Sequence, residues 1–259
     1  MTLLEAIILG IVQGLAEFLP ISSSGHLALG QYLFGIDDSN LVFIIVVHVG
    51  TLIPVIIVFR EAIWELIKKP FQKMTYLLLL ATVPAAIVGI FFDDAIEAAL
   101  GSMGFLAVGF VVTGLVLIGT DRLRKATKKS DEITYLDALL IGVAQAVAVF
   151  PGISRSGSTI AAALSRGIIR EDAAKFVFLM SIPAIAGALL LQIIHVVRGN
   201  VLLEDLNFVS LGAGFVAAAL SGYLAINFML AAIKKAKLRY FAYYVLLLAA
   251  AITVGLIIF

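Results

Sequence analysis

The chain has 259 residues, of which 62% are hydrophobic and only 14% are charged, and its mean hydropathy is +1.13. These values lie outside the range of soluble globular domains, so most of the chain is expected to lie within a membrane. The net charge of +1 gives no indication of nucleic-acid binding, and the absence of cysteine excludes disulfides and thiolate-bound metals.

In chain order, the pattern is an interrupted apolar segment, three apolar spans, a second interrupted segment and three more spans. The six spans are each long enough to cross a membrane as a helix. They are Leu41–Phe59, Tyr76–Phe92, Phe105–Thr120, Phe176–Val197, Phe208–Leu230 and Phe241–Phe259.

The two interrupted segments share one arrangement. Leu3–Leu19 runs into the polar stretch PISSSGH and continues as the short arm Leu27–Ile36, whereas Tyr135–Phe150 runs into PGISRSGST and the arm Ile160–Leu164. Ten helical residues cover about 15 Å, roughly half of the hydrocarbon core. Each segment is therefore predicted to form a re-entrant helical hairpin, shielded from lipid by the surrounding protein.

The two halves of the chain are related in sequence. With an offset of 132 residues, LEAIILGIVQGLAEFLPISSSGHL matches LDALLIGVAQAVAVFPGISRSGST at ten of 24 positions. One copy is predicted to comprise residues 1–120 and the other residues 121–259, within a single integral membrane domain of residues 1–259. Because each copy has three crossings, the copies are expected to be inverted relative to each other.

The distribution of lysine and arginine indicates the orientation. If the first hairpin opens to the outside, 16 of the 18 basic residues fall on the inside, in agreement with the positive-inside rule. They are Arg60, Lys68, Lys69, Lys73, Arg122, Arg124, Lys125, Lys128, Lys129, Arg166, Arg170, Lys175, Lys234, Lys235, Lys237 and Arg239. We expect a multi-pass protein of the plasma (inner) membrane, with both termini and the active site facing outside.

The positions at which the two hairpins differ are the better candidates for function. The unlike pairs are Glu17 with Val149, Ser23 with Arg155, and His26 with Ser158. The shared serines and glycines are expected to form the common architecture of the hairpins.

Arg155 is the first candidate, because an ionised arginine near membrane depth is costly without a partner. One interpretation is an internal salt bridge to Glu17; the other is a bidentate phosphate clamp. The surrounding GISRSGST resembles a phosphate loop but lacks its lysine, so ATP binding is not expected. Hydroxyls and backbone N–H groups at a helix N-terminus still favour an anion. The predicted phosphate-binding residues are Ser22, Ser154, Ser156, Gly157 and Thr159.

The first hairpin contains candidates for an acid–base group (Glu17), a nucleophile (Ser23) and a base (His26). Ser23 and His26 share a face of a helix that begins near Ser22, so the imidazole can take the proton of the hydroxyl. Gln13 and Glu17 share the face of the preceding helix, where they are candidate metal ligands. Structural interpretations stay open for several of these residues: helix capping for Ser22, packing for His26 and scaffold for Gln13. His48, in the first span, is a candidate at the border of the site.

The motifs QGLAEFLPISSSGH and PGISRSGST resemble the two signature motifs of the undecaprenyl-diphosphate phosphatases, the bacitracin-resistance proteins of bacterial membranes. The resemblance covers essentially the full chain. It implies hydrolysis of a polyprenyl diphosphate lipid with Mg²⁺ or Ca²⁺, and recycling of the lipid carrier for peptidoglycan and other envelope polymers. By position, it assigns the acidic motif to Gln13 and Glu17, the serine to Ser23, the histidine to His26 and the arginine to Arg155.

One alternative function is an inverted-repeat transporter of an anion or of the lipid phosphate. Membrane phosphatases of the phosphatidic acid type are not favoured, because no histidine follows Arg155 until His195. The prenyl chain length, the identity of the metal and the choice among serine, histidine and water as nucleophile stay open, as does homodimer formation.

Overall fold

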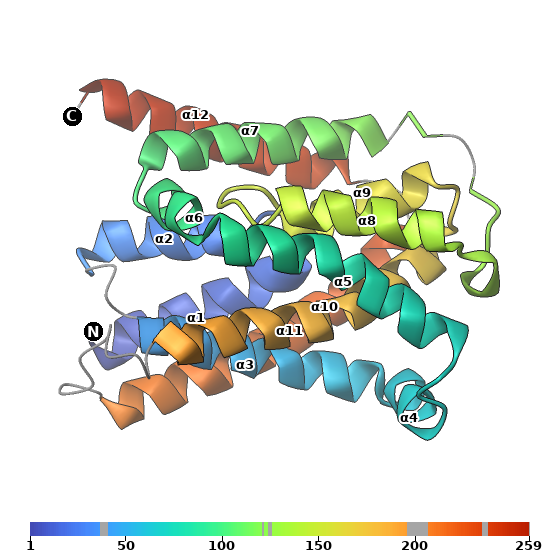
Figure 1. Ribbon diagram of the computed structural model, residues 1–259. Coiled ribbons are helices and arrows are strands. Elements are labelled where there is room, and N and C mark those ends of the chain that lie inside the picture. The colour runs from blue at the N-terminus through green and yellow to red at the C-terminus, as the bar shows by residue number, and fades with distance from the viewer. Residues whose placement is uncertain (37–40, 121, 124–125, 196–206, 235–237, 259) are drawn as a thin grey trace.

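The computed structural model describes residues 1–36, 41–120, 122–123, 126–195, 207–234 and 238–258. These residues form α-helices and one short 3₁₀-helix, Ser130–Glu132, and contain no strand (Figure 1). The α-helices are α1 (Leu3–Phe18), α2 (Ser23–Phe34), α3 (Leu41–Val58), α4 (Arg60–Lys68), α5 (Lys73–Phe91), α6 (Asp93–Leu100), α7 (Met103–Thr120), α8 (Tyr135–Val147), α9 (Arg155–Ser165), α10 (Arg170–His195), α11 (Phe208–Lys234) and α12 (Arg239–Ile258).

Six of these helices, α3, α5, α7, α10, α11 and α12, are long and apolar enough to cross a membrane. They coincide with the six predicted spans, so an all-α, multi-pass membrane protein is confirmed. Several spans extend further than hydropathy indicates; α10, for example, begins at Arg170 rather than Phe176. Its first turn carries Glu171 and Asp172, which suit the positive end of a helix but carry no apolar signal. Some residues used in the predictions lie outside the described part of the chain: Arg124, Lys125, Val197, Lys235, Lys237 and Phe259.

Two short helices, α4 and α6, are not anticipated by the pattern of spans. Each directly follows a crossing, and each carries charged residues in its first turn. In α4, the ammonium of Lys68 lies 5.2 Å from the centre of the exposed Trp64 ring. Such amphipathic helices are suited to the membrane–water boundary, where charged and aromatic side chains both find favourable surroundings.

The two interrupted segments form two pairs of helices, α1 with α2 and α8 with α9. Figure 1 shows both chain termini at one end of the bundle, where α1 also begins, whereas α8 begins at the opposite end. The loop before α8 is fastened to both helices of its pair. Asp137, in the first turn of α8, accepts hydrogen bonds from Lys128 at 2.7 Å and from Arg166 at 2.8 Å. Burial alone would raise the pKa of Asp137, but the hydrogen bonds from Lys128, Thr134 and Arg166 outweigh it and hold that pKa below its ordinary value.

The helix pairs pack across the two halves of the chain. The α1 helix lies against α11, and its sequence counterpart α8 lies against α5. Close approach of the backbones requires small residues at both contacts. A Cβ added to Gly14 of α1 would lie 2.3 Å from the carbonyl oxygen of Ala218, and one added to Gly142 of α8 would lie 2.5 Å from that of Ala81. Each half therefore completes the packing of the other.

Candidate active site

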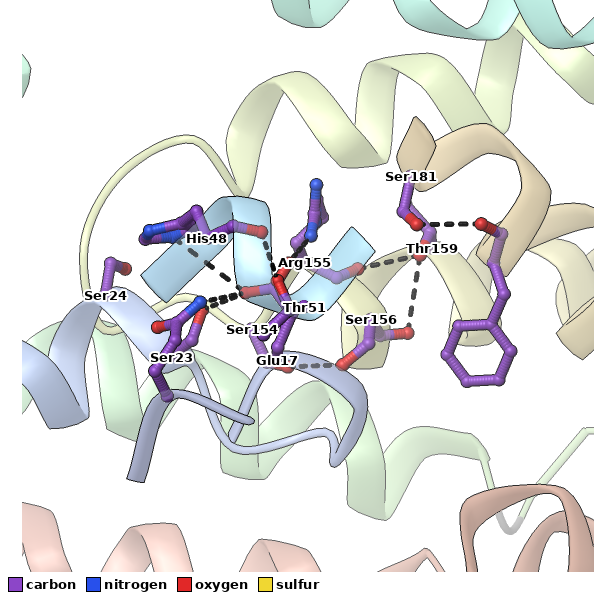
Figure 2. A network of polar contacts seen from close by, with 12 residues as sticks. Glu17, Ser23, Ser24, His48, Thr51, Ser154, Arg155, Ser156, Thr159 and Ser181 are labelled. Atoms are coloured by element: carbon purple, nitrogen blue, oxygen red, sulfur yellow. Dashed lines mark hydrogen bonds and ion pairs between the residues drawn. The ribbon is translucent and has the colours of Figure 1, made fainter. Parts of the chain in front are cut away.

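Glu17 and Arg155 join the two motifs. Glu17 lies in the last turn of α1, Arg155 is the first residue of α9, and the Nη2 of Arg155 donates a hydrogen bond to Oε1 of Glu17 (Figure 2). The side chain of Glu17 is only 2% exposed and that of Arg155 is 25% exposed. A charged pair in this position requires mutual compensation, because either charge alone would be poorly solvated.

The second carboxylate oxygen of Glu17 gathers three further side chains. Ser23 donates its hydroxyl proton to Oε2 at 2.7 Å, and the amide nitrogen of Gln13 donates to the same atom at 3.0 Å. The Nε2 of His48, on α3, lies 4.0 Å from this oxygen (Figure 2). Glu17 is thus the centre of the site, with a guanidinium on one oxygen and polar groups of α1, α2 and α3 around the other.

The turn between α1 and α2 places Ser23 beside Glu17. Proline at position 20 disfavours helical geometry in Leu19, so α1 ends at Phe18. Ser22 then caps α2 by accepting the N–H of Gly25, as expected from its position before a helix. Ser22 has φ of 73°, a left-handed conformation that a residue with a side chain adopts only when its surroundings enforce it.

The turn before α9 is held against α7. Ser154 caps α9 by accepting the N–H of Gly157 at 3.1 Å, and its own N–H donates to the hydroxyl of Thr113 at 2.8 Å. Thr113 in turn donates to the carbonyl oxygen of Gly152 at 2.9 Å. Gly152 has φ of 82°, and its backbone passes so close to Gly109 that neither position has room for a Cβ. Because Arg155 directly follows Ser154, this turn fixes the position from which the guanidinium of Arg155 extends toward Glu17.

The predicted phosphate-binding hydroxyls make internal hydrogen bonds. Ser156 donates to the carbonyl oxygen of Leu19 at 3.0 Å, and so ties the second motif to the turn of the first. Thr159 lies one turn further along α9 and donates to the carbonyl oxygen of Arg155 at 2.7 Å. These residues lie near the Glu17–Arg155 pair, but the phosphate-binding roles of the set stay a prediction.

The hydrogen bonds of His26 go to Ser22 and Tyr244. Its Nδ1 faces the carbonyl oxygen of Ser22 at 2.7 Å and therefore carries the proton, while its Nε2 accepts the hydroxyl of Tyr244 at 2.8 Å. The imidazole also stacks on the Tyr244 ring and meets Phe110 edge-on. Ser23 and His26 do share the start of α2, as predicted, but the hydroxyl of Ser23 is bonded to Glu17 rather than to the imidazole.

The space between the Glu17–Arg155 pair and α10 is small. A cavity of about 10 Å³ lies among Glu17, Phe18, Gln145, Arg155, Ser156, Thr159, Val177, Phe178 and Ser181. This volume corresponds to about one water molecule and is too small for a phosphate group. On this side, the guanidinium of Arg155 and the carboxylate of Glu17 contact each other and leave no room for a substrate phosphate.

The fold and the site together define a class of protein: a multi-pass helical membrane protein with a buried acid, a guanidinium and a hydroxyl brought together from the two halves of its chain. Comparison with known sequences gives the family. The model of the family described as "Bacitracin resistance protein BacA" matches residues 6–251, and the chain belongs to this family.

Curated relatives match over nearly their whole length. An undecaprenyl-diphosphatase of Carboxydothermus hydrogenoformans is 47% identical over 250 residues, which is 96% of each chain. Undecaprenyl-diphosphatase 4 of Bacillus cereus is 46% identical over 245 residues, or 95% of this chain and 94% of the relative. An undecaprenyl-diphosphatase of Rubrobacter xylanophilus is 39% identical over an alignment of 274 positions, which covers 99% of each chain.

Proposed function

We propose that this protein hydrolyses undecaprenyl diphosphate, or a related polyprenyl diphosphate, to the monophosphate and inorganic phosphate. The reaction returns a lipid carrier to envelope synthesis and confers resistance to bacitracin. The single observation that carries the proposal is the convergence of Arg155 and Ser23 on the two oxygens of one buried carboxylate, Glu17. The names of the relatives point to the same chemistry, and a phosphatase is favoured over a transporter.

Two inverted copies with re-entrant helix pairs form the proposed scaffold. Three observations support this: α1 and α8 begin at opposite ends of the bundle, the contacts α1 with α11 and α8 with α5 are equivalent, and the described helix ends rich in lysine and arginine lie away from the two termini (Figure 1). By the positive-inside rule, both termini and the entrance to the site then face the outside.

Substrate binding is proposed to separate the ion pair. The diphosphate carries more negative charge than one carboxylate and offers several oxygens, so it competes with Glu17 for the guanidinium of Arg155. The N-terminal backbone N–H groups of α2 and α9 add further donors for the phosphate oxygens. The prenyl tail stays in the lipid, against the apolar outer faces of the helices.

Ser23 is the proposed nucleophile and Glu17 the proposed base. The hydroxyl of Ser23 already donates its proton to Glu17 at 2.7 Å, so that proton has an acceptor when the oxygen attacks the terminal phosphorus. A Ser23 Oγ–phosphorus bond forms as the bridging P–O bond breaks, and the polyprenyl monophosphate leaves. Water then hydrolyses the phosphoserine and releases inorganic phosphate. Arg155 stabilises the charge on the phosphoryl oxygens in both steps.

The residues around Glu17 fit a divalent cation. Among the described residues no cluster of three His, Cys, Asp or Glu side chains could hold a metal, so a cation here would depend on Glu17, Gln13 and the phosphates of the substrate. The Oε1 of Gln13 is buried and has no hydrogen-bond partner in the described part of the chain, as expected of an unused ligand. This donor set suits Mg²⁺ or Ca²⁺, which prefer oxygen and keep several ligands from water or substrate. When bound, the cation would neutralise phosphate charge.

The test is phosphate release by the purified full-length protein in detergent micelles. Undecaprenyl diphosphate, a shorter prenyl diphosphate and a soluble diphosphate are compared, and the remaining lipid is identified by mass spectrometry. We expect inorganic phosphate and the monophosphate lipid in equal amounts, and loss of both in Ser23→Ala. Release unchanged by Ser23→Ala would contradict the serine nucleophile, and no release from any prenyl diphosphate would contradict the function.

A further inference from the structure

His48 presents an unprotonated nitrogen to the carboxylate of Glu17. Its Nδ1 lies 2.8 Å from the carbonyl oxygen of Ile44 in the preceding turn of α3 and therefore carries the ring proton of the neutral imidazole. The other nitrogen, Nε2, then has a lone pair, and it faces Oε2 of Glu17 across 4.0 Å. This distance is too long for a direct hydrogen bond, so it leaves room for a bridging group between the two atoms.

The gap between the two atoms has the width of a metal site. Bonds from a divalent transition metal or zinc to an imidazole nitrogen and to a carboxylate oxygen are each about 2.1 Å, so one ion can bridge atoms separated by up to about 4.2 Å. Gln13 belongs to the same group, because its Nε2 is 3.0 Å from Oε2 of Glu17 while its Oε1 is buried and has no partner among the described residues. The bond from Nδ1 to Ile44 is also what metal-binding histidines commonly make with their second nitrogen.

The positive group of Arg155 does not occupy this position. It contacts the other carboxylate oxygen, Oε1, whereas Oε2 accepts hydrogen bonds from Gln13 and Ser23 and faces His48. One carboxylate can therefore hold the guanidinium and a cation on opposite oxygens.

We propose that His48 is a nitrogen ligand of the divalent cation, together with Glu17 and Gln13. The proposal rests on the proposed function and deepens it, because an imidazole in the donor set changes which metal the protein prefers. Sites made only of oxygen atoms suit Mg²⁺ and Ca²⁺. An imidazole ligand favours Zn²⁺ and Co²⁺, and it also strengthens the binding of Mn²⁺ relative to that of Mg²⁺. This protein is therefore a phosphatase with a mixed nitrogen and oxygen site.

His26 supplies a matched control. It is also an imidazole close to the site, but its Nε2 accepts the hydroxyl of Tyr244 and its Nδ1 donates to Ser22, so neither nitrogen is left for a metal. Replacement of either histidine by glutamine removes one imidazole and keeps a polar side chain of similar length.

The experiment uses Mn²⁺ as the probe and the purified full-length protein without substrate. Electron spin echo spectroscopy detects a histidine nitrogen bound to Mn²⁺, and titration gives the affinity. We expect nitrogen modulation in the wild type and in His26→Gln. In His48→Gln we expect its loss, with Mn²⁺ binding weaker by about tenfold or more and Mg²⁺ competition changed less than about threefold.

Modulation that persists in His48→Gln, or that is absent from the wild type, overturns the assignment. If His48→Gln does not yield a monodisperse protein, His48→Asn takes its place with the same expected loss of modulation, and modulation lost in His26→Gln also overturns the assignment. Phosphate release is measured in parallel. If the protein hydrolyses prenyl diphosphates but shows no nitrogen-bound Mn²⁺, the His48 assignment is wrong and the proposed function stands. If it shows nitrogen-bound Mn²⁺ but hydrolyses no prenyl diphosphate, the proposed function is wrong and the His48 assignment stands.

Discussion

Replacing Arg155 by alanine tests how much the Glu17–Arg155 ion pair contributes to stability and how much it contributes to catalysis. The substitution leaves the carboxylate of Glu17, which is 2% exposed, without its guanidinium, although Gln13 and Ser23 still donate hydrogen bonds to it. Removal of one member of a buried pair typically costs about 3–5 kcal/mol. Because a quarter of the Arg155 side chain is exposed, we expect the lower end, about 3 kcal/mol.

Catalysis is expected to suffer more than stability. An arginine that stabilises a phosphoryl group in the transition state contributes about 10³-fold or more, equivalent to about 4 kcal/mol of activation free energy. The double variant Glu17→Gln, Arg155→Met removes both charges and keeps similar volumes. It is expected to regain most of the lost stability and none of the lost activity.

Two measurements decide between these contributions. Thermal unfolding in detergent compares the single and double variants, and phosphate release from undecaprenyl diphosphate gives kcat/KM. If Arg155→Ala keeps activity within tenfold of the wild type, the guanidinium does not hold the transferring phosphate. If the double variant is no more stable than Arg155→Ala, the buried unpaired carboxylate is not what destabilises the single variant.

Three further predictions concern the supports of the site. Tyr244→Phe removes one hydrogen bond to His26 and should cost about 1 kcal/mol of stability in unfolding experiments; an unaltered melting temperature would show that the contact does not stabilise the fold. Gly109→Ala places a Cβ 2.4 Å from a backbone carbonyl oxygen of the second motif and should cost about 2 kcal/mol of stability in unfolding experiments, whereas Gly119→Ala, which meets no atom within 4 Å, serves as the neutral control. The pKa of Asp137 is lower in the folded protein than in the unfolded chain, so its contribution is complete at neutral pH and is lost progressively below about pH 5. Melting temperatures should fall over that range in the wild type, and Asp137→Asn should be less stable at neutral pH and respond less to acid.

The spans and the meeting of the two motifs could be predicted because both leave local signals. An apolar run of about twenty residues indicates a crossing regardless of its neighbours. The proximity of Arg155 to Glu17 was one of two interpretations of a charge that needs a partner, and the structure shows the contact. The interpretation of Arg155 as a phosphate clamp stays a prediction. It is compatible with the ion pair, because a guanidinium that pairs with Glu17 in the absence of substrate can also bind phosphate.

Other contacts leave no signal in the pattern. The bond between His26 and Tyr244 joins positions 218 residues apart, and nothing in the last span distinguishes this tyrosine from its neighbours. Thr113, which supports the turn before α9, is likewise one polar residue in an apolar helix. The side of α3 on which His48 lies depends on how that helix rotates against α1, which the even hydrophobicity of a membrane span does not determine.

The cross-pairing of the helices also governs the order in which the protein can be completed during translation. The surface that receives Gly14 of α1 lies around Ala218 of α11, which the ribosome adds 204 residues later. Until the second half is made, Glu17 lacks the guanidinium of Arg155 and α1 lacks its contact with α11. The nascent first half is therefore expected to stay incompletely packed until the second half arrives, and neither half is expected to persist when expressed without the other.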